Sequence, residues 1–303
     1  MTLRNAGDTP PGNNVRMNDH DHPRAPLNRR RLLGAGLAGA GIALAPDTRA
    51  ATPRTARVPL TVQATEGPYY FDAKQLRADI TEGLPGIALE VRLALVDETG
   101  TPLPRARVDL WHCNAAGVYS GYAGQGEDHR TDTRGKTFLR GTQLSDREGI
   151  AAFRSIYPGW YEGRTTHIHF KVLIGTRMVL TSQFFLPDAL SEYLYTQADD
   201  YRRNSVRDTL NSQDGIAIQA GATVLGAVRQ EADRYVAMLT VAVDRQAKPV
   251  LDRPPVPGDG PPPGPPPGMP PGQMGGAGGP PPRPTALEGA ARVRALLPGT
   301  RQP

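Results

Sequence analysis

The sequence predicts an all-β fold, an antiparallel β-sandwich with a few short helices, flanked by disordered N- and C-terminal extensions. Two observations lead to this class. Short segments in which apolar and polar residues alternate recur between residues 89 and 243, and clusters of Gly, Pro, Asp and Thr separate them. The part of the chain with this pattern, residues 52–248, holds about 195 residues, which is enough for one domain with a substantial core.

The expected elements follow from local pattern. Strands are predicted at residues 89–96, 106–111, 137–144, 150–156, 167–174, 178–185 and 235–243. Residues 98–102 have the composition of a turn, and residues 175–177 have that of a tight hairpin. Residues 189–197 and 201–210 are predicted to be short helices. Many short strands with turn signals between them are typical of a sandwich.

The first 51 residues are predicted to be a leader that does not belong to the domain. A polar stretch over residues 1–27 precedes three arginines at 29–31, and a run of small apolar residues follows at 34–45. This order predicts a Tat-type signal peptide over residues 1–51, and therefore export to the periplasm or the extracellular space. The apolar run is short for a membrane span, so none is expected in the mature chain, with a retained anchor as the alternative.

Residues 249–303 are predicted to be a disordered tail. Pro and Gly dominate residues 252–284, which hold almost no large apolar side chains and cannot bury enough surface to fold. Their period is too irregular for collagen. Residues 285–297 are the exception, because they have the pattern of a short helix with Arg292 and Arg294 on its polar side.

Charge and cysteine content exclude two other classes of protein. The net charge is +5, but the arginines are scattered and no basic run is interleaved with aromatic residues, so no nucleic-acid partner is expected. Cys113 is the single cysteine, which permits no internal disulfide, and it is expected to be buried. His112 beside it is expected to be structural, and His129, in a charged loop, is expected to be solvated.

A pair of histidines on one predicted strand has the spacing of metal ligands. Successive side chains of a strand point to opposite faces, so His167 and His169 point the same way, with Cα atoms about 6.6 Å apart. Both imidazoles can then reach one ion. Two polar residues on the exposed face of a strand are the alternative for an isolated pair, and the residues around it decide between the two.

Four short motifs follow one another in a defined order within about residues 62–190. They are Trp111, Asn114, Gly117 and Tyr119; Pro158, Gly159 and Tyr161; Arg164, His167 and His169; and Gln183. In this order and spacing they resemble the motifs of the intradiol ring-cleavage dioxygenases, a family of non-haem ferric enzymes that includes catechol and protocatechuate dioxygenases. Each motif alone is a weak signal, and the four together are a strong one.

The resemblance implies an enzyme that holds Fe(III) with Tyr119, Tyr161, His167 and His169. It implies a small aromatic diol and O2 as substrates, cleavage of the catechol ring between its two hydroxylated carbons, and a muconate-type dicarboxylate as product. The residue types suit this ion, because hard trivalent iron prefers anionic oxygen donors and accepts imidazole. A free tyrosine ionises only at a pH of about 10, and a bound cation reverses that preference.

For catalysis, the resemblance implies that Tyr161 leaves the metal when a catechol chelates it, and that Tyr161 then takes up a substrate proton. Arg164 is expected over the ring, where it stabilises developing negative charge, with an ordinary surface cation as the alternative. Gln183 is expected to orient a ligand, with a plain strand amide as the alternative. Tyr69 or Tyr70 is expected to line the substrate pocket, because the family has a similar Thr-x-Gly-Pro-Tyr segment.

Two other tyrosines compete for the ligand positions. Tyr157 lies in the same predicted turn as Tyr161, and Tyr122 follows Tyr119 closely. The Pro-Gly-x-Tyr register favours Tyr161 over Tyr157.

The chain departs from the family pattern in two ways. The helical N-terminal segment that catechol-type members use for dimer contacts has no counterpart between the leader and Thr65, so the oligomeric state stays open. The spacing between Tyr161 and His167 is short, which predicts a pocket open to bulkier or more varied catechols.

Two other functions fit part of this pattern. An exported β-sandwich binding module without dioxygenase activity would keep the fold and tolerate Phe in place of Tyr119 or Tyr161. A zinc or copper enzyme could use the same histidines.

Overall fold

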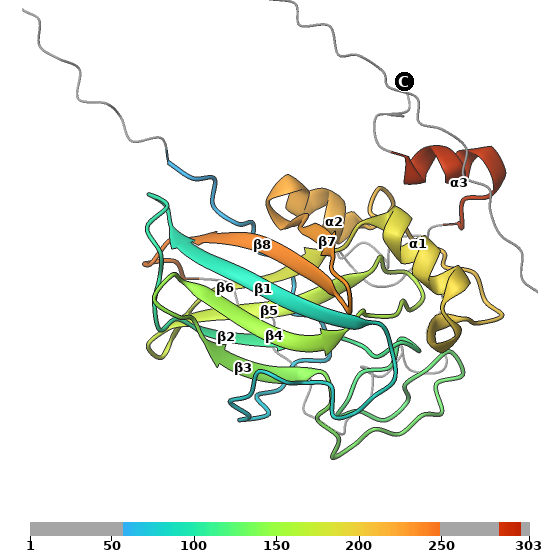
Figure 1. Cartoon of the computed structure of the whole chain (residues 1–303), viewed down its shortest axis with the longest axis horizontal. Helices are drawn as coiled ribbons and strands as arrows, with labels where there is room; N and C mark the ends of the chain where they lie inside the picture. The colour runs from blue at the N-terminus through green and yellow to red at the C-terminus, as the bar shows by residue number, and fades with distance from the viewer. Residues whose placement is uncertain (1–56, 249–284, 298–303) are drawn as a thin grey trace, which may run out of the picture. The chain divides into compact units, whose positions relative to one another are not determined.

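The computed structural model describes residues 57–248 and 285–297, and its main part is a sandwich of two four-stranded sheets. The strands are β1 (Ala88–Asp97), β2 (Arg107–Trp111), β3 (Arg140–Leu144), β4 (Ile150–Ile156), β5 (His167–Ile174), β6 (Arg177–Phe185), β7 (Ala227–Gln230) and β8 (Tyr235–Val243). One sheet has the order β4-β1-β8-β7 and the other the order β3-β2-β5-β6 (Figure 1). The predicted β-sandwich with few short helices is therefore confirmed.

Pairing within the sheets is antiparallel with one exception. Strands β1 and β8 run parallel, in a register that joins Leu89 to Tyr235 and Asp97 to Val243. The alternation along each strand shows which residues face the core, but it does not show which strand becomes its neighbour or in which direction, so this pair could not be predicted.

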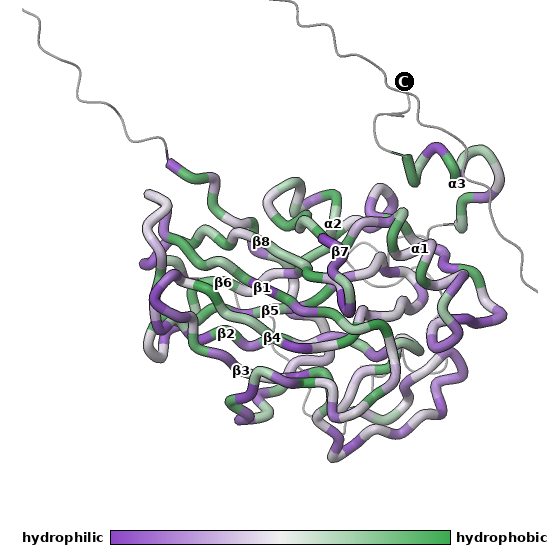
Figure 2. The backbone as a smooth tube through the Cα atoms, viewed as in Figure 1, coloured by the Kyte–Doolittle hydropathy of each residue, from purple (hydrophilic) through white to green (hydrophobic). Residues whose placement is uncertain are grey.

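The core lies between the two sheets. Every second residue of β1 is buried, from Leu89 to Leu95, and these residues pack in one core cluster with Ile168, Phe170 and Val172 of β5. Figure 2 shows hydrophobic and hydrophilic stretches alternating along the strands, and hydrophilic residues along many of the connecting loops. Each large apolar side chain buried in this way stabilises the fold by about 1.5–3 kcal/mol.

Most predicted strand bounds agree with the structure, and two differ for a local reason. Residues 137–139 are not part of β3, because Leu139 has a φ of +56°, which interrupts the extended backbone before the strand begins. Arg177 is already part of β6, so the hairpin turn consists of Gly175 and Thr176. Gly175 has a φ of +63°, which fits the first central position of a type II′ turn.

Short helices follow the strands in the second half of the chain. They are α1 (Asp188–Gln197), α2 (Gly215–Ala220), α3 (Gly289–Leu296) and two 3-10 turns, Asp199–Tyr201 and Gly221–Val224. None of the helices in the described ranges is long and apolar enough to cross a bilayer. The predicted helix at 189–197 is confirmed, and α3 lies inside the predicted range 285–297.

The predicted helix at 201–210 is wrong. Only Tyr201 is in a helical turn, and residues 202–210 are irregular. This loop contains Asn, Ser, Asp and Thr, whose side chains compete with helical hydrogen bonds, and Asp208 accepts from the Gly163 N–H of the segment before β5 instead. Strand β7 and helix α2 were not predicted, because both are short.

The leader and most of the tail fall outside the described ranges. The signal peptide over residues 1–51, the Pro- and Gly-rich residues 252–284, and the domain bounds 52–248 and 249–303 therefore stay predictions.

His112 connects the two sheets at the end of β2. Its Nδ1–H donates to the carbonyl of Cys113 at 2.7 Å, and its Nε2 accepts from the hydroxyl of Ser155 on β4, also at 2.7 Å. Burial lowers the pKa of His112 to about 4. This buried histidine is structural, as expected from the sequence.

We expect His112 to make stability depend on pH. Its pKa of about 4 in the fold is below the value of about 6.5 in an unfolded chain, so its contribution is complete above pH 6.5 and is lost as the pH falls toward 4. The full effect is about 3 kcal/mol in the free energy of unfolding. Urea unfolding between pH 4 and 8 should show a flatter slope for His112→Gln than for the unchanged chain. The exposed His129, changed to Gln, is the matched control and should leave the slope as it is. An equal slope for both variants would contradict the assignment.

Candidate active site

Two tyrosines and two histidines meet at the start of β5. The Nε2 atoms of His167 and His169 are 3.0 Å apart, and the hydroxyl oxygens of Tyr161 and Tyr119 lie 3.1 Å and 3.4 Å from the Nε2 atom of His167. Ligands at right angles on one metal ion, with bonds of about 2.1 Å, are about 3 Å apart. The four donor atoms therefore have the spacing of a single coordination sphere.

Strand register places the histidines on the outer face of their sheet. On β5 the residues that alternate with the core residues are His167, His169 and Lys171. His169 pairs with Trp111 on β2 and with Gln183 on β6, so these three side chains lie on one face. A small cluster, separate from the main core, covers this face. It consists of Trp111, Cys113 and Tyr119 with the partly buried Tyr69, Tyr70 and Tyr161.

The loops that carry the two tyrosines pack backbone against backbone. A Cβ atom on Gly117 would lie 2.2 Å from the carbonyl oxygen of Trp160, and one on Gly159 would lie 2.3 Å from that of Ala115. Gly117 also has a φ of +78°, which L-residues rarely adopt. These glycines let the Tyr119 loop approach the Tyr161 loop, which explains their place in the two motifs.

Hydrogen bonding and stacking orient the imidazoles. The Nδ1–H of His167 donates to the carbonyl of Thr165 at 2.6 Å, so its Nε2 carries the lone pair that faces the cluster. The ring of His169 stacks on Trp111, with centroids 4.9 Å apart and planes 12° apart. The Nδ1 of His169 is buried and has no hydrogen-bond partner among the described residues, so stacking is the main restraint on this ring.

A segment before the sandwich lies over the histidines. A Cβ atom on Gly67 would contact the Cε1 atom of His169 at 3.3 Å, so the backbone touches this imidazole directly. The preceding residue, Glu66, forms a buried ion pair with Lys171 of β5. This ion pair fixes segment 64–70 against the same face of the sheet that carries the histidines.

Burial sets the protonation of the four side chains. It lowers the pKa of His167 to about 3 and lowers that of His169 well below its usual value, so both imidazoles are neutral at pH 7. It raises the pKa of Tyr161 to about 12, with the charge of Arg164 acting in the opposite direction, and raises that of Tyr119 well above its usual value. The histidines are ready to bind a metal, and the phenols ionise only beside a cation.

The side chains of Asp214 and Gln183 hold Arg164 in place. Its Nε–H donates to the carboxylate of Asp214 at 2.8 Å, and its Nη2–H donates to the side-chain oxygen of Gln183. The amide nitrogen of Gln183 in turn donates to the carbonyl of Thr65 at 2.8 Å. Gln183 therefore orients Arg164, a contact that the sequence did not predict, and its expected role in orienting a ligand stays a prediction.

Asp214 is a site residue that sequence reasoning missed. It is 3% exposed, and the oxygen that accepts from Arg164 also accepts the Thr165 N–H at 3.0 Å. Its other oxygen accepts from Ile216 N–H and Ala217 N–H, which caps α2. An Asp directly before a short helical pattern is a cap signal in the sequence, but nothing there shows that it also binds Arg164.

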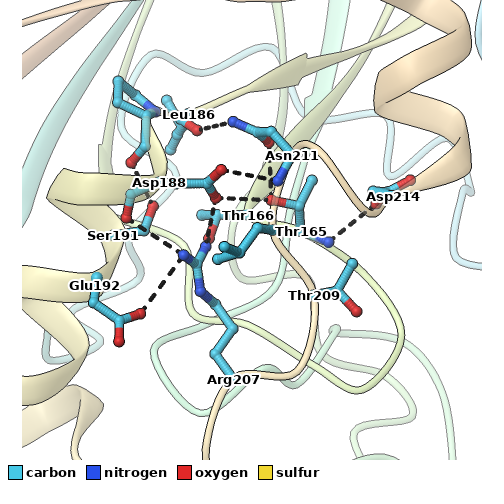
Figure 3. Close-up of polar contacts among 12 residues, drawn as sticks. Thr165, Thr166, Leu186, Asp188, Ser191, Glu192, Arg207, Thr209, Asn211 and Asp214 are labelled. Carbon is cyan, nitrogen blue, oxygen red and sulfur yellow. Dashed lines mark hydrogen bonds and ion pairs between the residues drawn. The ribbon is translucent and has the colours of Figure 1, made fainter. Parts of the chain in front are cut away.

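Polar contacts continue behind the site (Figure 3). Arg207 is buried and pairs with Asp188 at 2.9 Å. Asp188 also accepts from the Asn211 N–H at 2.9 Å, and Thr165 donates its hydroxyl to the side-chain oxygen of Asn211 at 2.9 Å. These contacts connect α1 and the 207–214 loop to the residues directly before His167.

A cleft of about 630 Å³ opens beside the cluster. Its inner wall contains Tyr69, Tyr119, Tyr161 and Arg164. Tyr69 stacks on Tyr119 with ring centroids 4.6 Å apart, whereas Tyr70 packs on Trp111 instead. Of the two tyrosines expected to line the pocket, Tyr69 is therefore the one that does. The volume is within the range of small-molecule sites.

The competing tyrosines lie elsewhere. The hydroxyl of Tyr157 is 2.8 Å from that of Ser191 on α1. The hydroxyl of Tyr122 donates to the carbonyl of Tyr70 at 3.0 Å. Cys113 is buried, as expected, and burial raises the pKa of its thiol to about 12. His129 is exposed and lies at the outer edge of the cleft.

Comparison with known proteins gives consistent matches. A family model described as Dioxygenase matches residues 65–214. The catechol 1,2-dioxygenase of Acinetobacter baylyi is 30% identical over 227 residues, and the match covers 67% of this chain and 67% of that protein. The catechol 1,2-dioxygenase of Candida albicans is 29% identical over 167 residues, covering 46% of this chain and 52% of that protein. The chain thus spans about half the length of the second relative.

The solved structure of an intradiol ring-cleavage dioxygenase from Tetranychus urticae has the same fold. It superposes with a TM-score of 0.58 at 27% identity, covering 63% of this chain and 98% of that one. A sandwich of this kind is the scaffold of an oxidoreductase of the dioxygenase class. The chain belongs to the intradiol ring-cleavage dioxygenase family.

We expect Gly117→Ala to disturb the cluster far more than a glycine change with open space around it. Gly117→Ala adds a clash with the Trp160 carbonyl to the strain of a positive φ, for a loss of about 2–5 kcal/mol in the free energy of unfolding. Gly175→Ala is the matched control, because it has a positive φ and no heavy atom within 4 Å of the new Cβ, so only the strain of about 1–2 kcal/mol applies. Urea unfolding compares the two variants. Equal losses in the free energy of unfolding would show that close packing of the Tyr119 loop against the Tyr161 loop is not required.

Proposed function

We propose that this chain is an Fe(III)-dependent intradiol dioxygenase. It would cleave a catechol-type ring between its two hydroxylated carbons with O2, and both oxygen atoms would enter the muconate-type dicarboxylate product. The observation that carries this proposal is the convergence of Tyr119, Tyr161, His167 and His169 at the edge of a cleft. The similarity to the catechol 1,2-dioxygenases of Acinetobacter baylyi and Candida albicans supports a catechol as substrate.

The donor set favours iron over zinc or copper. It offers two phenol oxygens and two imidazole nitrogens, and two phenolates would offset most of the charge of a trivalent ion. Within residues 57–248 and 285–297, no three His, Cys, Asp or Glu side chains gather as they would in a zinc site of those residue types. The four residues that would hold the ion are Tyr119, Tyr161, His167 and His169.

Bound ferric iron would supply what these side chains lack, namely chelation of both catechol oxygens and withdrawal of electron density from the ring. Tyr161 is the better placed of the two tyrosines to exchange with substrate, because it is partly exposed at the cleft while Tyr119 is 1% exposed. The phenolate oxygen of Tyr161, at the cleft, would accept a proton from a substrate hydroxyl. Tyr119, His167 and His169 would stay in place.

Arg164 would supply fixed positive charge at the ring. Asp214 and Gln183 hold its guanidinium on two sides, so it needs no rearrangement when negative charge develops on the substrate. Preorganised charge in a site with little water stabilises a transition state more than the same charge would in solution.

A binding module without activity explains less of this geometry. Such a module has no need to bury Tyr119 against two neutral histidines, and family membership supports an enzyme. Export by the Tat pathway to the periplasm or the extracellular space is also our proposal. It rests on the arginines and apolar run of residues 29–45, which lie outside the described ranges.

The tyrosine assignment is tested by visible spectroscopy of the iron-loaded chain. We expect a broad phenolate-to-iron charge-transfer band, which moves to longer wavelength when catechol is added without oxygen. Tyr119→Phe and Tyr161→Phe should each weaken the band, whereas Tyr157→Phe, whose hydroxyl contacts Ser191, should keep it. A colourless, iron-replete, folded protein would mean that the tyrosines are not ligands. Unchanged turnover by Tyr161→Phe would contradict the proposal that Tyr161 gives way to the substrate.

The charge of Arg164 is tested with two substitutions of similar length. We expect Arg164→Met to lower kcat for catechol cleavage by roughly 10²–10³-fold, the usual effect of losing one preorganised group. Arg164→Lys should keep part of the rate, because it retains the charge but not both hydrogen bonds. The charge-transfer band should persist in both variants, which separates loss of charge from loss of iron. Equal kcat for Arg164→Met and the unchanged chain would remove Arg164 from the mechanism.

A further inference from the structure

The cleft is much larger than a catechol requires. A cavity of roughly 150 Å³ holds a benzene ring, whereas this cleft has a volume of about 630 Å³. The space beyond the inner wall is lined by groups that take no part in the proposed chemistry. The charged ones are Glu127, Glu162, Arg203 and Asp208. A ring substituent would extend toward these groups, so their charges act on any charge that the substituent carries.

The two cations of the cleft are already engaged. Arg164 is bound by Asp214 and Gln183. Arg203 pairs with Glu127 at 3.2 Å, donates to the carbonyl of Trp160, and stacks over the Trp160 ring with its guanidinium carbon 3.9 Å from the centroid. A carboxylate on a substrate would have to compete with these protein partners for either guanidinium.

Asp208 has a different environment. Its carboxylate accepts from the Gly163 N–H at 2.9 Å and from the hydroxyl of Thr209 at 3.0 Å, and both of these donors are neutral. Gly163 lies in the turn between Tyr161 and Arg164, so this negative charge is anchored directly beside the catalytic turn. Glu162, on the same turn, is exposed at the cleft.

The cleft is therefore negative although the chain is positive. Its lining holds three carboxylates and two guanidinium groups, a net charge of −1, against +5 for the whole chain. Opposite charges attract and like charges repel most strongly where water is partly excluded, as it is in a cleft.

We propose that Asp208 is a specificity-determining residue that makes the cleft select catechols with a cationic substituent, such as an alkylammonium group, over catechols with a carboxylate. The selection rests on the proposed function, because it acts on the substrate of that same site. The ammonium group would lie against Asp208, while the ring reaches the cluster of Tyr161 and His167.

Three catechols of matched size test the selection. They carry a 4-(2-aminoethyl), a 4-(2-hydroxyethyl) or a 4-(carboxymethyl) group, which are positive, neutral and negative at pH 7. For the iron-loaded full chain we expect kcat/KM to fall in that order, with roughly tenfold between the first and the last. The dissociation constants measured by calorimetry without oxygen should follow the same order. Both differences should shrink at high salt.

Matched variants assign the effect to Asp208. Asp208→Asn keeps an oxygen that can accept from Gly163 and removes the charge, so the preference for the ammonium compound should drop severalfold toward that for the neutral one. Asp233→Asn removes the same charge from an exposed position that does not line the cleft, and the preference should remain. Glu162→Gln provides a second test at an exposed position and should reduce the preference in the same direction.

The outcomes separate this inference from the proposed function. If all three catechols are cleaved at equal rates, or if Asp208→Asn and Asp233→Asn keep the same preference, the inference is overturned while the dioxygenase assignment stands. If neither catechol nor any of the three compounds is cleaved and no charge-transfer band forms, both are overturned. The expected order, lost in Asp208→Asn, supports both.

Discussion

The alternation of side chains along β5 is the constraint on which the rest of this structure depends. Ile168, Phe170 and Val172 enter the core between the sheets, so His167 and His169 must face the other way. A shift of one residue in register would turn the imidazoles into the core between the sheets and the apolar residues onto the face of the site. Packing of the sandwich and placement of the donor atoms are therefore one requirement, and the stability of the core holds the cluster in place before any ion binds.

A site built on the outer face of a sheet needs neighbouring segments to cover it, and buried ion pairs hold such segments in place. Lys171 pairs with Glu66, Arg164 with Asp214, and Arg207 with Asp188. Removing one partner from such a pair typically costs 3–5 kcal/mol, because the other charge stays buried without compensation. The first pair connects segment 64–70 to β5. The other two connect the loop 207–214 to Arg164, just before β5, and to α1.

The sequence was sufficient for the parts that local pattern determines. The strands containing His167, Val91 and Val241 were predicted because alternation appears within a few residues. The four cluster residues were expected from the resemblance of their short motifs to those of the family. Asp214, Asp208 and the parallel pairing of β1 with β8 could not be predicted, because they depend on contacts between distant segments. The loop at 202–210 was misjudged for the same reason, since its Asp208 side chain binds Gly163, before β5, and the loop forms no helix.

The parallel contact between β1 and β8 also has a consequence for how the molecule forms. Leu89 meets Tyr235 only after nearly the whole domain has left the ribosome, and until then β1 presents an unpaired edge in the middle of its sheet. Contacts this far apart in sequence raise the contact order and slow folding into the range of milliseconds to seconds. The newly made chain is therefore most exposed to aggregation just before its last strand arrives, and any change that delays β8 should lower the yield of folded protein more than its stability.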